Sequence, residues 1–275
     1  MVSAQLIENT QDQYRRISRI TTKLRRGGRL DWDSIIDSTR DSYKTESHDT
    51  ARDCVTSAIK NFRLDRWEDQ PYYVEVWTEK RGHIAVLYST TDRLDVQICE
   101  CGGKRLLTED SVSGLLRAQG KGKMNRIIYV GDYDPSGLRM DHNMQEQLDN
   151  WGIRVVWKRV ALTLDQIDEY EIRRAYTVQD KASATWVKKH PDVEILGHDT
   201  EGRPLVNKLE KDANAQWFKD QNDGDLFQVE VDALEVSVLR ELVENAITAI
   251  MKTDAYDAML VEENRQRHEI YKLLA

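Results

Sequence analysis

The chain has 275 residues, 40% of them hydrophobic, with seven Trp and eleven Tyr, so its composition favours a packed core and excludes intrinsic disorder. The formal net charge of −8 excludes a uniformly basic nucleic-acid binder but not a local basic patch. No apolar run approaches the ~20 residues of a membrane span, and no signal peptide is recognisable. Three cysteines without a disulfide framework indicate a cytoplasmic protein.

A basic amphipathic helix is predicted near the N-terminus. Residues 14–29 contain no acidic residue, and Ile17, Ile20 and Leu24 recur at helical spacing. A solvated surface is the simpler explanation of a charge run, but a single-sign run in an acidic protein repels itself, and DNA phosphates would neutralise it. We therefore predict that the basic residues of this segment contact DNA, namely Arg15, Arg16, Arg19, Lys23, Arg25, Arg26 and Arg29.

Two more helices and a linker complete the N-terminal region. The helices are expected from Asp31 or Asp33 to Ser38 and from Ser47 to Asn61, and the linker from Phe62 to Pro71. Strands and helices then alternate, which is typical of an α/β fold with a parallel sheet and crossover helices. The predicted strands are Tyr72–Thr78, Val96–Cys101, Arg126–Val130 and Ile153–Val160, and the helices between them are His83–Thr91, Ser111–Gln119 and Pro135–Asn150.

The C-terminal part has weaker signals. Residues 176–203 are polar and rich in turn-forming residues, so they are expected to form an irregular surface excursion. A helix from Val206 to Asp220, a strand from Phe227 to Val231, and two helices, Val236–Met251 and Tyr256–Leu274, are predicted after it. Cys99 and Cys101 alternate along a predicted strand and are assigned to core packing, with zinc binding the less favoured interpretation.

Acidic residues follow two of the predicted strands. Asp132 and Asp134 come after Ile127–Val130 and before a helix that starts at Pro135, and Glu79 follows the strand Tyr72–Thr78. Ligands of open α/β sheets bind at the carboxyl ends of strands. Two aspartates alone are equally consistent with a helix cap and a turn. Three clustered carboxylates repel one another unless a cation lies between them, and their hard oxygen atoms suit Mg2+.

These segments resemble the Toprim family, and in particular the A subunit of topoisomerase VI and its short phage, plasmid and archaeal relatives. VEVWTEK (74–80) precedes IIYVGDYDPSGLRMD (127–141), and RVALT (159–163) and EVDAL (230–234) follow in the order found in that family. LRRGGRLDW (24–32), with Asp37, Thr39 and Arg40, is similar to the winged-helix region of these proteins. The resemblance therefore covers nearly the whole chain.

The resemblance implies three regions: a partial winged-helix-like DNA-binding region at 1–70, a Toprim domain at 71–232 and a C-terminal helical extension at 233–275. It implies that Glu79, Asp132 and Asp134 hold Mg2+, with Glu79 also catalytic, during phosphoryl transfer on double-stranded DNA. It further implies a homodimer, a separate subunit for any ATPase activity, and a cytoplasmic or nucleoid-associated location. His83 lies one turn beyond Glu79, and a surface or core position is its simpler interpretation.

The nucleophilic tyrosine of that family is not found in the chain. Leu6–Thr10 matches the stretch that follows this tyrosine, so the tyrosine segment is expected upstream of Met1, or to have been lost. Tyr14 is out of register with it and is assigned to packing or DNA contact. The hypotheses are therefore a topoisomerase-type protein whose nucleophile segment is missing, a metal-dependent nuclease in which water attacks, and a non-catalytic DNA-binding module.

Overall fold

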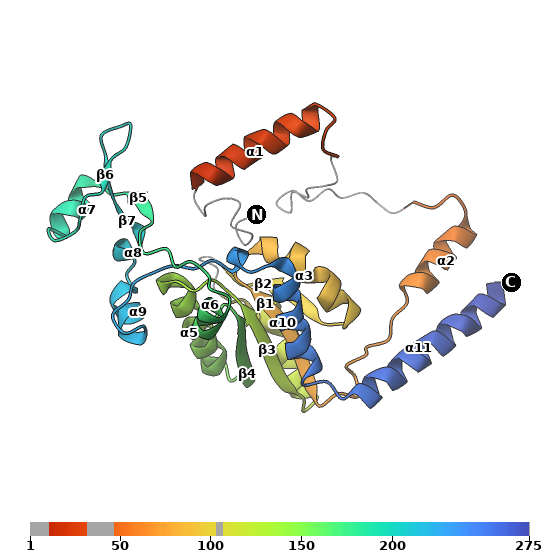
Figure 1. Ribbon diagram of the computed structural model, residues 1–275. Coiled ribbons are helices and arrows are strands. Elements are labelled where there is room, and N and C mark those ends of the chain that lie inside the picture. The colour runs from red at the N-terminus through yellow and green to blue at the C-terminus, as the bar shows by residue number, and fades with distance from the viewer. Residues whose placement is uncertain (1–10, 32–46, 103–106, 275) are drawn as a thin grey trace.

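The computed structural model describes residues 11–31, 47–102 and 107–274 (Figure 1). Its centre is a four-stranded sheet of order β2-β1-β3-β4, in which all neighbouring strands are parallel. The predicted α/β class with a parallel sheet is confirmed. The strands lie within a few residues of their predicted positions, at β1 Tyr72–Thr78, β2 Gln97–Glu100, β3 Met124–Val130 and β4 Val155–Ala161.

The crossover helices were also predicted correctly. Each connects one strand to the next parallel strand, as this topology requires. Thr108 caps the second helix by accepting the backbone N–H of Ser111, and Asp134 caps the third by accepting that of Gly137. The bounds are α3 Arg81–Arg93, α4 Glu109–Gly120 and α5 Pro135–Asn150, and a short helix, α6 Leu164–Glu169, follows β4.

Helices cover both faces of the sheet. Successive side chains of a strand point to opposite faces, so β1 and β3 each contribute to two hydrophobic clusters. Val76 and Val130 belong to one cluster, which contains Leu87 of α3 and four residues of α10 (Val236–Thr248), namely Leu239, Val243, Ala246 and Ile247. Trp77 and Tyr129 belong to the other cluster, with residues of α4 and α5, namely Val112, Leu115, Met144 and Leu148.

Three helices lie at the ends of the chain: α1 Gln11–Arg26, α2 Ala51–Asn61 and α11 Thr253–Leu274. In Figure 1, α2 and α11 extend side by side, and they contact each other. Glu263 of α11 is 1% exposed. It fixes the linker between α2 and β1, because it accepts hydrogen bonds from the backbone N–H of Leu64 and the guanidinium of Arg66. Arg267 also donates to this carboxylate.

The segment 176–203 forms the predicted surface excursion, but it is not irregular as predicted. Three short strands form an antiparallel sheet of order β5-β7-β6, which Figure 1 shows projecting beside the main sheet. The backbone pairs locally here, for example from the Ala182 N–H to the Pro204 carbonyl. The elements are β5 Gln179–Lys181, α7 Ala184–Lys189, β6 Gly197–His198 and β7 Pro204–Asn207.

Two further predictions need correction. The single helix Val206–Asp220 is instead the end of β7 followed by α8 Lys208–Lys211 and α9 Ala215–Gln221, because Asn207 leaves the strand and caps α8. The strand Phe227–Val231 is reduced to isolated bridges, Ala175 to Gln228 and Tyr133 to Val229. The chain then turns into a short 3-10 helix, η2 Val231–Ala233, so the alternating pattern never enters a sheet ladder.

The winged-helix resemblance rests partly on residues outside the described part of the chain, namely Trp32, Asp37, Thr39 and Arg40. The predicted helix ending at Ser38, and Leu6–Thr10, lie outside the described residues. Before residue 71, the described segments contain α1, α2 and no strand. Among the described residues, no helix has the length and apolar character needed to cross a membrane.

Candidate metal centre at the carboxyl edge of the sheet

The carboxyl ends of β1 and β3 place Glu79 beside Asp132. Thr78 is in register with Val130, and the Glu79 N–H donates to the Val130 carbonyl at 2.9 Å, which continues the ladder beyond β1. The side chain of Glu79 then reaches across, because its Oε2 accepts the backbone N–H of Asp132 at 2.9 Å. The predicted proximity of these two residues is therefore observed.

Asp134 joins the same edge at the start of α5. Its Oδ1 accepts the Gly137 N–H at 2.6 Å, as expected for an N-cap. A Cβ atom at Gly137 would lie 3.1 Å from Asp134 Oδ1, 3.2 Å from Glu79 Oε2 and 2.7 Å from the Asp132 carbonyl oxygen. Three oxygen atoms thus converge on the space beside Gly137, which a side chain at this position would fill.

The carboxylate of Asp132 is oriented differently. It is nearly buried, at 4% exposure. Its Oδ1 accepts the Val231 N–H at 2.9 Å, and its Oδ2 pairs with the Lys80 ammonium at 2.7 Å. Both oxygen atoms of Asp132 are therefore engaged by groups of the protein itself.

Burial and neighbouring negative charges raise the pKa values of two carboxyl groups at this edge, those of Glu79 and Asp134. Burial raises the pKa of Glu79 to about 7, and repulsion from Asp132 and Asp134 adds to this effect. Burial also raises the pKa of Asp134, with a further contribution from Asp132, although the Gly137 N–H opposes the rise. A cation among these groups would relieve both penalties.

The three carboxylates fit a divalent metal in chemistry but not yet in arrangement. Their hard oxygen atoms suit Mg2+, and Gly137 places no side chain between those of Glu79 and Asp134. However, no group of three His, Cys, Asp or Glu side chains within residues 11–31, 47–102 and 107–274 is arranged to hold a metal ion as it stands. The obstacle visible at Asp132 is its engagement with Lys80.

Sequence reasoning did not assign the residues that surround Lys80. Its Nζ lies 3.2 Å from Glu230 Oε2 and 3.8 Å from Asp232 Oδ2, at the two ends of the E-x-D segment. Burial alone would lower the pKa of Lys80, but Asp132 and then these two carboxylates raise it overall. The charged residues themselves are visible in the sequence, as the adjacent Glu79 and Lys80 and as the E-x-D segment. The sequence does not show, however, that these two segments contact each other.

His83 is a core residue beside this group, which agrees with its simpler interpretation. It is 3% exposed, and its Nδ1 lies 3.1 Å from the Thr78 hydroxyl. Its Nε2 lies 3.5 Å from Asp232 Oδ1. His83 thus contacts the outer carboxylate of the edge and not Glu79.

Arg159, the first residue of the RVALT segment, braces the loop that carries Asp132. Its guanidinium donates to the carbonyls of Gly131 at 2.8 Å and Leu162 at 2.9 Å. It also pairs with Asp141 of α5 at 2.8 Å. The end of β3, the end of β4 and α5 are therefore held together by one cation.

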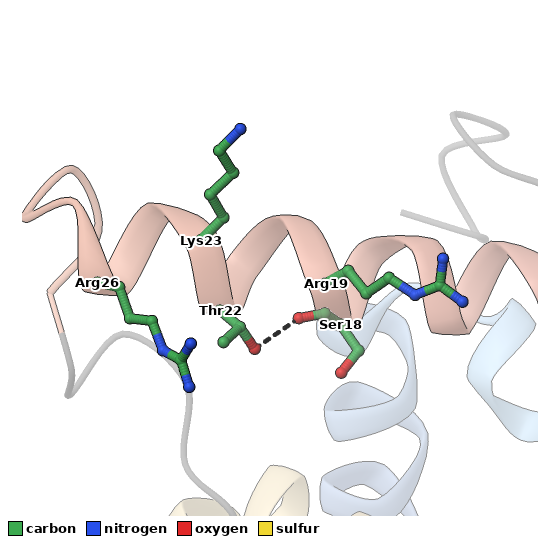
Figure 2. Close-up of a pocket in the computed structure, with 5 residues that line it drawn as sticks. All are labelled: Ser18, Arg19, Thr22, Lys23 and Arg26. Carbon is green, nitrogen blue, oxygen red and sulfur yellow. Dashed lines mark hydrogen bonds between the residues drawn. The ribbon is translucent and has the colours of Figure 1, made fainter.

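The predicted DNA-binding residues lie on or just after α1. All are exposed except Arg25, which is half-buried. The apolar face is less covered than predicted, because Ile17 and Leu24 are only half-buried and Ile20 is 47% exposed. Figure 2 shows a shallow surface pocket lined by Ser18, Arg19, Thr22, Lys23 and Arg26. Within it the Thr22 hydroxyl donates to the Ser18 carbonyl at 2.8 Å.

Comparisons with protein-family models, curated proteins and solved structures find no match to this chain. The function is therefore argued from the geometry of the sheet edge and from the charge of α1, together with the motif resemblance.

Proposed function

We propose that this protein is a Toprim protein of the topoisomerase VI A-subunit type, which binds double-stranded DNA and uses Mg2+ for strand cleavage. The observation that carries the proposal is the placement of Glu79, Asp132 and Asp134 together at the carboxyl ends of β1 and β3, where Glu79 Oε2 accepts the Asp132 N–H. The raised pKa of Glu79 supports it, because a site built to hold a cation is electrostatically strained without one. A homodimer and a separate ATPase partner belong to the same proposal.

Each group has a distinct role in this proposal. Bound Mg2+ would orient a DNA phosphate and neutralise charge that develops on it during phosphoryl transfer. Glu79 and Asp134 would supply oxygen ligands beside Gly137, and Asp132 would supply the third. Arg159 keeps the Asp132 loop in place through the Gly131 carbonyl. The exposed cations of α1 bind the DNA backbone without reading its sequence.

A metal-dependent nuclease is the second candidate, and one observation favours it. The pKa of Glu79, near 7, lies in the range that suits a general acid or base, which water-mediated cleavage uses. A tyrosine nucleophile would leave protein covalently attached to DNA ends, whereas water would leave free ends. DNA binding that is insensitive to metal and gives no cleavage would instead identify a non-catalytic DNA-binding module.

The metal site is tested by calorimetric titration of Mg2+ into the wild type and the variants Glu79→Gln, Asp132→Asn and Asp134→Asn. Each variant should bind Mg2+ at least about tenfold more weakly, because one of three charged ligands is removed. Folding should hold, since Asn at 134 can still accept the Gly137 N–H and carboxylate repulsion falls.

Asp149→Asn is the matched control, because Asp149 is exposed at the far end of α5. The same proteins are then incubated with supercoiled plasmid and Mg2+, denatured, and examined for nicked DNA and for protein retained on DNA ends. Equal Mg2+ affinities in all five proteins would refute the site.

A further inference from the structure

Lys80 is the cation at the centre of the acidic edge. Its Nζ lies 2.7 Å from Asp132 Oδ2, 3.2 Å from Glu230 Oε2 and 3.8 Å from Asp232 Oδ2. These three carboxylates come from two segments about 100 residues apart, after β3 and at η2. An ammonium placed among three carboxylates occupies a position that a metal ion would also favour.

The contacts of Asp132 place the lysine and a metal in competition for this residue. Its Oδ1 is held by the Val231 N–H at 2.9 Å, so Oδ2 is the oxygen available to a new ligand, and Lys80 already holds it. An ammonium and Mg2+ on the same oxygen would repel each other at short range. Binding of Mg2+ to Oδ2 would therefore favour withdrawal of the ammonium from Asp132.

The ammonium has a second position ready. Glu230 is fixed by Gln228, whose side-chain amide donates to Oε1 at 2.9 Å, and this leaves Oε2 for Lys80. Asp232 lies beside His83 on the other side. The Lys80 side chain is 35% exposed, so it has room to rotate about its flexible stem.

We propose that Lys80 is a positioning residue that holds the Asp132 carboxylate in the metal-free protein and yields it to Mg2+, remaining paired with Glu230 and Asp232. This inference rests on the proposed metal site. It explains why the three predicted ligands lie together without forming a metal-ready group in the described chain. Glu230 and Asp232 of the E-x-D segment then bind the ammonium after it leaves Asp132.

The test is Lys80→Met, which keeps the length of the side chain and removes its charge. Without the competing ammonium, Mg2+ should bind about tenfold more tightly than to the wild type. Metal-free Lys80→Met should unfold at a lower temperature, since its carboxylates lose their counter-ion. Its unfolding midpoint should then rise more on addition of Mg2+ than that of the wild type.

Lys211→Met is the matched control. Lys211 also pairs with an aspartate, Asp180, at 2.6 Å, and its side chain is 22% exposed, but it lies in the small sheet region. Its replacement should change stability without changing Mg2+ affinity. Lys80→Gln, which removes the charge but keeps a donor to Asp132, is the second variant and should also bind Mg2+ more tightly.

The outcomes separate this inference from the proposed function. If the wild type binds Mg2+ and both Lys80 variants bind it equally or more weakly, the lysine is only a structural ion-pair partner and the inference is overturned. Failure of both variants to fold even with Mg2+ would also overturn it, because the ion is expected to replace the ammonium. If neither the wild type nor the variants bind Mg2+, the proposed metal site itself fails.

Discussion

Replacing Glu79 by Gln should change how the stability of the metal-free protein depends on pH. Burial, with repulsion from Asp132 and Asp134, raises the pKa of this carboxyl from 4.5 to about 7 in the folded chain. The folded state therefore holds the proton more tightly than the unfolded state does. The resulting stabilisation is complete below about pH 4.5 and is lost as the pH rises through about 7.

The size of the effect follows from the same shift. A rise in pKa from 4.5 to about 7 corresponds to about 3 kcal/mol between the two ends of this range, and solvent at the edge makes that an upper limit. Gln carries no charge at any pH and can still accept the Asp132 N–H that Glu79 binds at 2.9 Å. The variant should therefore match the wild type near pH 4 and be more stable by up to about 3 kcal/mol near pH 8.

The assay is urea unfolding of both proteins between about pH 4 and 8.5, first with a chelator and then with Mg2+. Mg2+ should stabilise the wild type at high pH more than it stabilises Glu79→Gln. Glu146→Gln, an exposed substitution on α5, is the control and should leave the difference between the two pH limits unchanged. Parallel pH profiles for wild type and Glu79→Gln would refute the claim that this carboxyl is strained by its neighbours.

Changing Arg15, Arg19, Lys23 and Arg26 together to Ala should weaken binding to all duplex sequences about equally. The slope of log K against log salt, measured by fluorescence anisotropy, should fall by roughly 0.9 for each phosphate that the variant no longer neutralises, and an unchanged slope would place the DNA surface elsewhere. Glu263→Ala should destabilise the chain by about 3–5 kcal/mol in urea unfolding, because Arg66 and Arg267 lose their buried partner. Glu262→Ala, which removes an exposed pair with Arg265, should cost much less, and equal destabilisation by the two substitutions would show that the linker clamp is not structural.

The sheet was predictable because its signals are local. The strand that became β3 is a run of apolar residues that ends sharply at Gly131, and Pro135 marks the start of α5. The small antiparallel sheet lacked such a signal, since β6 has only two residues and β5 pairs with β7 across the intervening helix α7 and strand β6. In Phe227–Val231 apolar and polar residues alternate because the apolar side chains are buried. The backbone of this segment, however, pairs through only two isolated bridges.

The carboxylates of the site were predictable for the same reason, because each follows a strand and parallel strands bring their ends to one edge. The role of Lys80 was not. Its partners are Glu230, which precedes η2, and Asp232, which lies within it. Both are far along the chain from Lys80, and the contact depends on the path of the backbone after the bridge at Val229. The spacing of apolar residues in the sequence does not predict this backbone path.

The charge balance of the edge explains why the proposed metal and the proposed DNA surface depend on each other. Among the described residues, Glu79, Asp132, Asp134, Glu230 and Asp232 form an acidic group, in which Lys80 pairs with Asp132, Glu230 and Asp232. A DNA phosphate brought near by α1 would meet net repulsion there, because these charges are partly buried and weakly screened. A divalent ion reverses the sign of the interaction at the point of closest approach. In the proposed mechanism, the cations of α1 therefore provide affinity for the duplex, whereas access of a phosphate to the sheet edge waits for Mg2+.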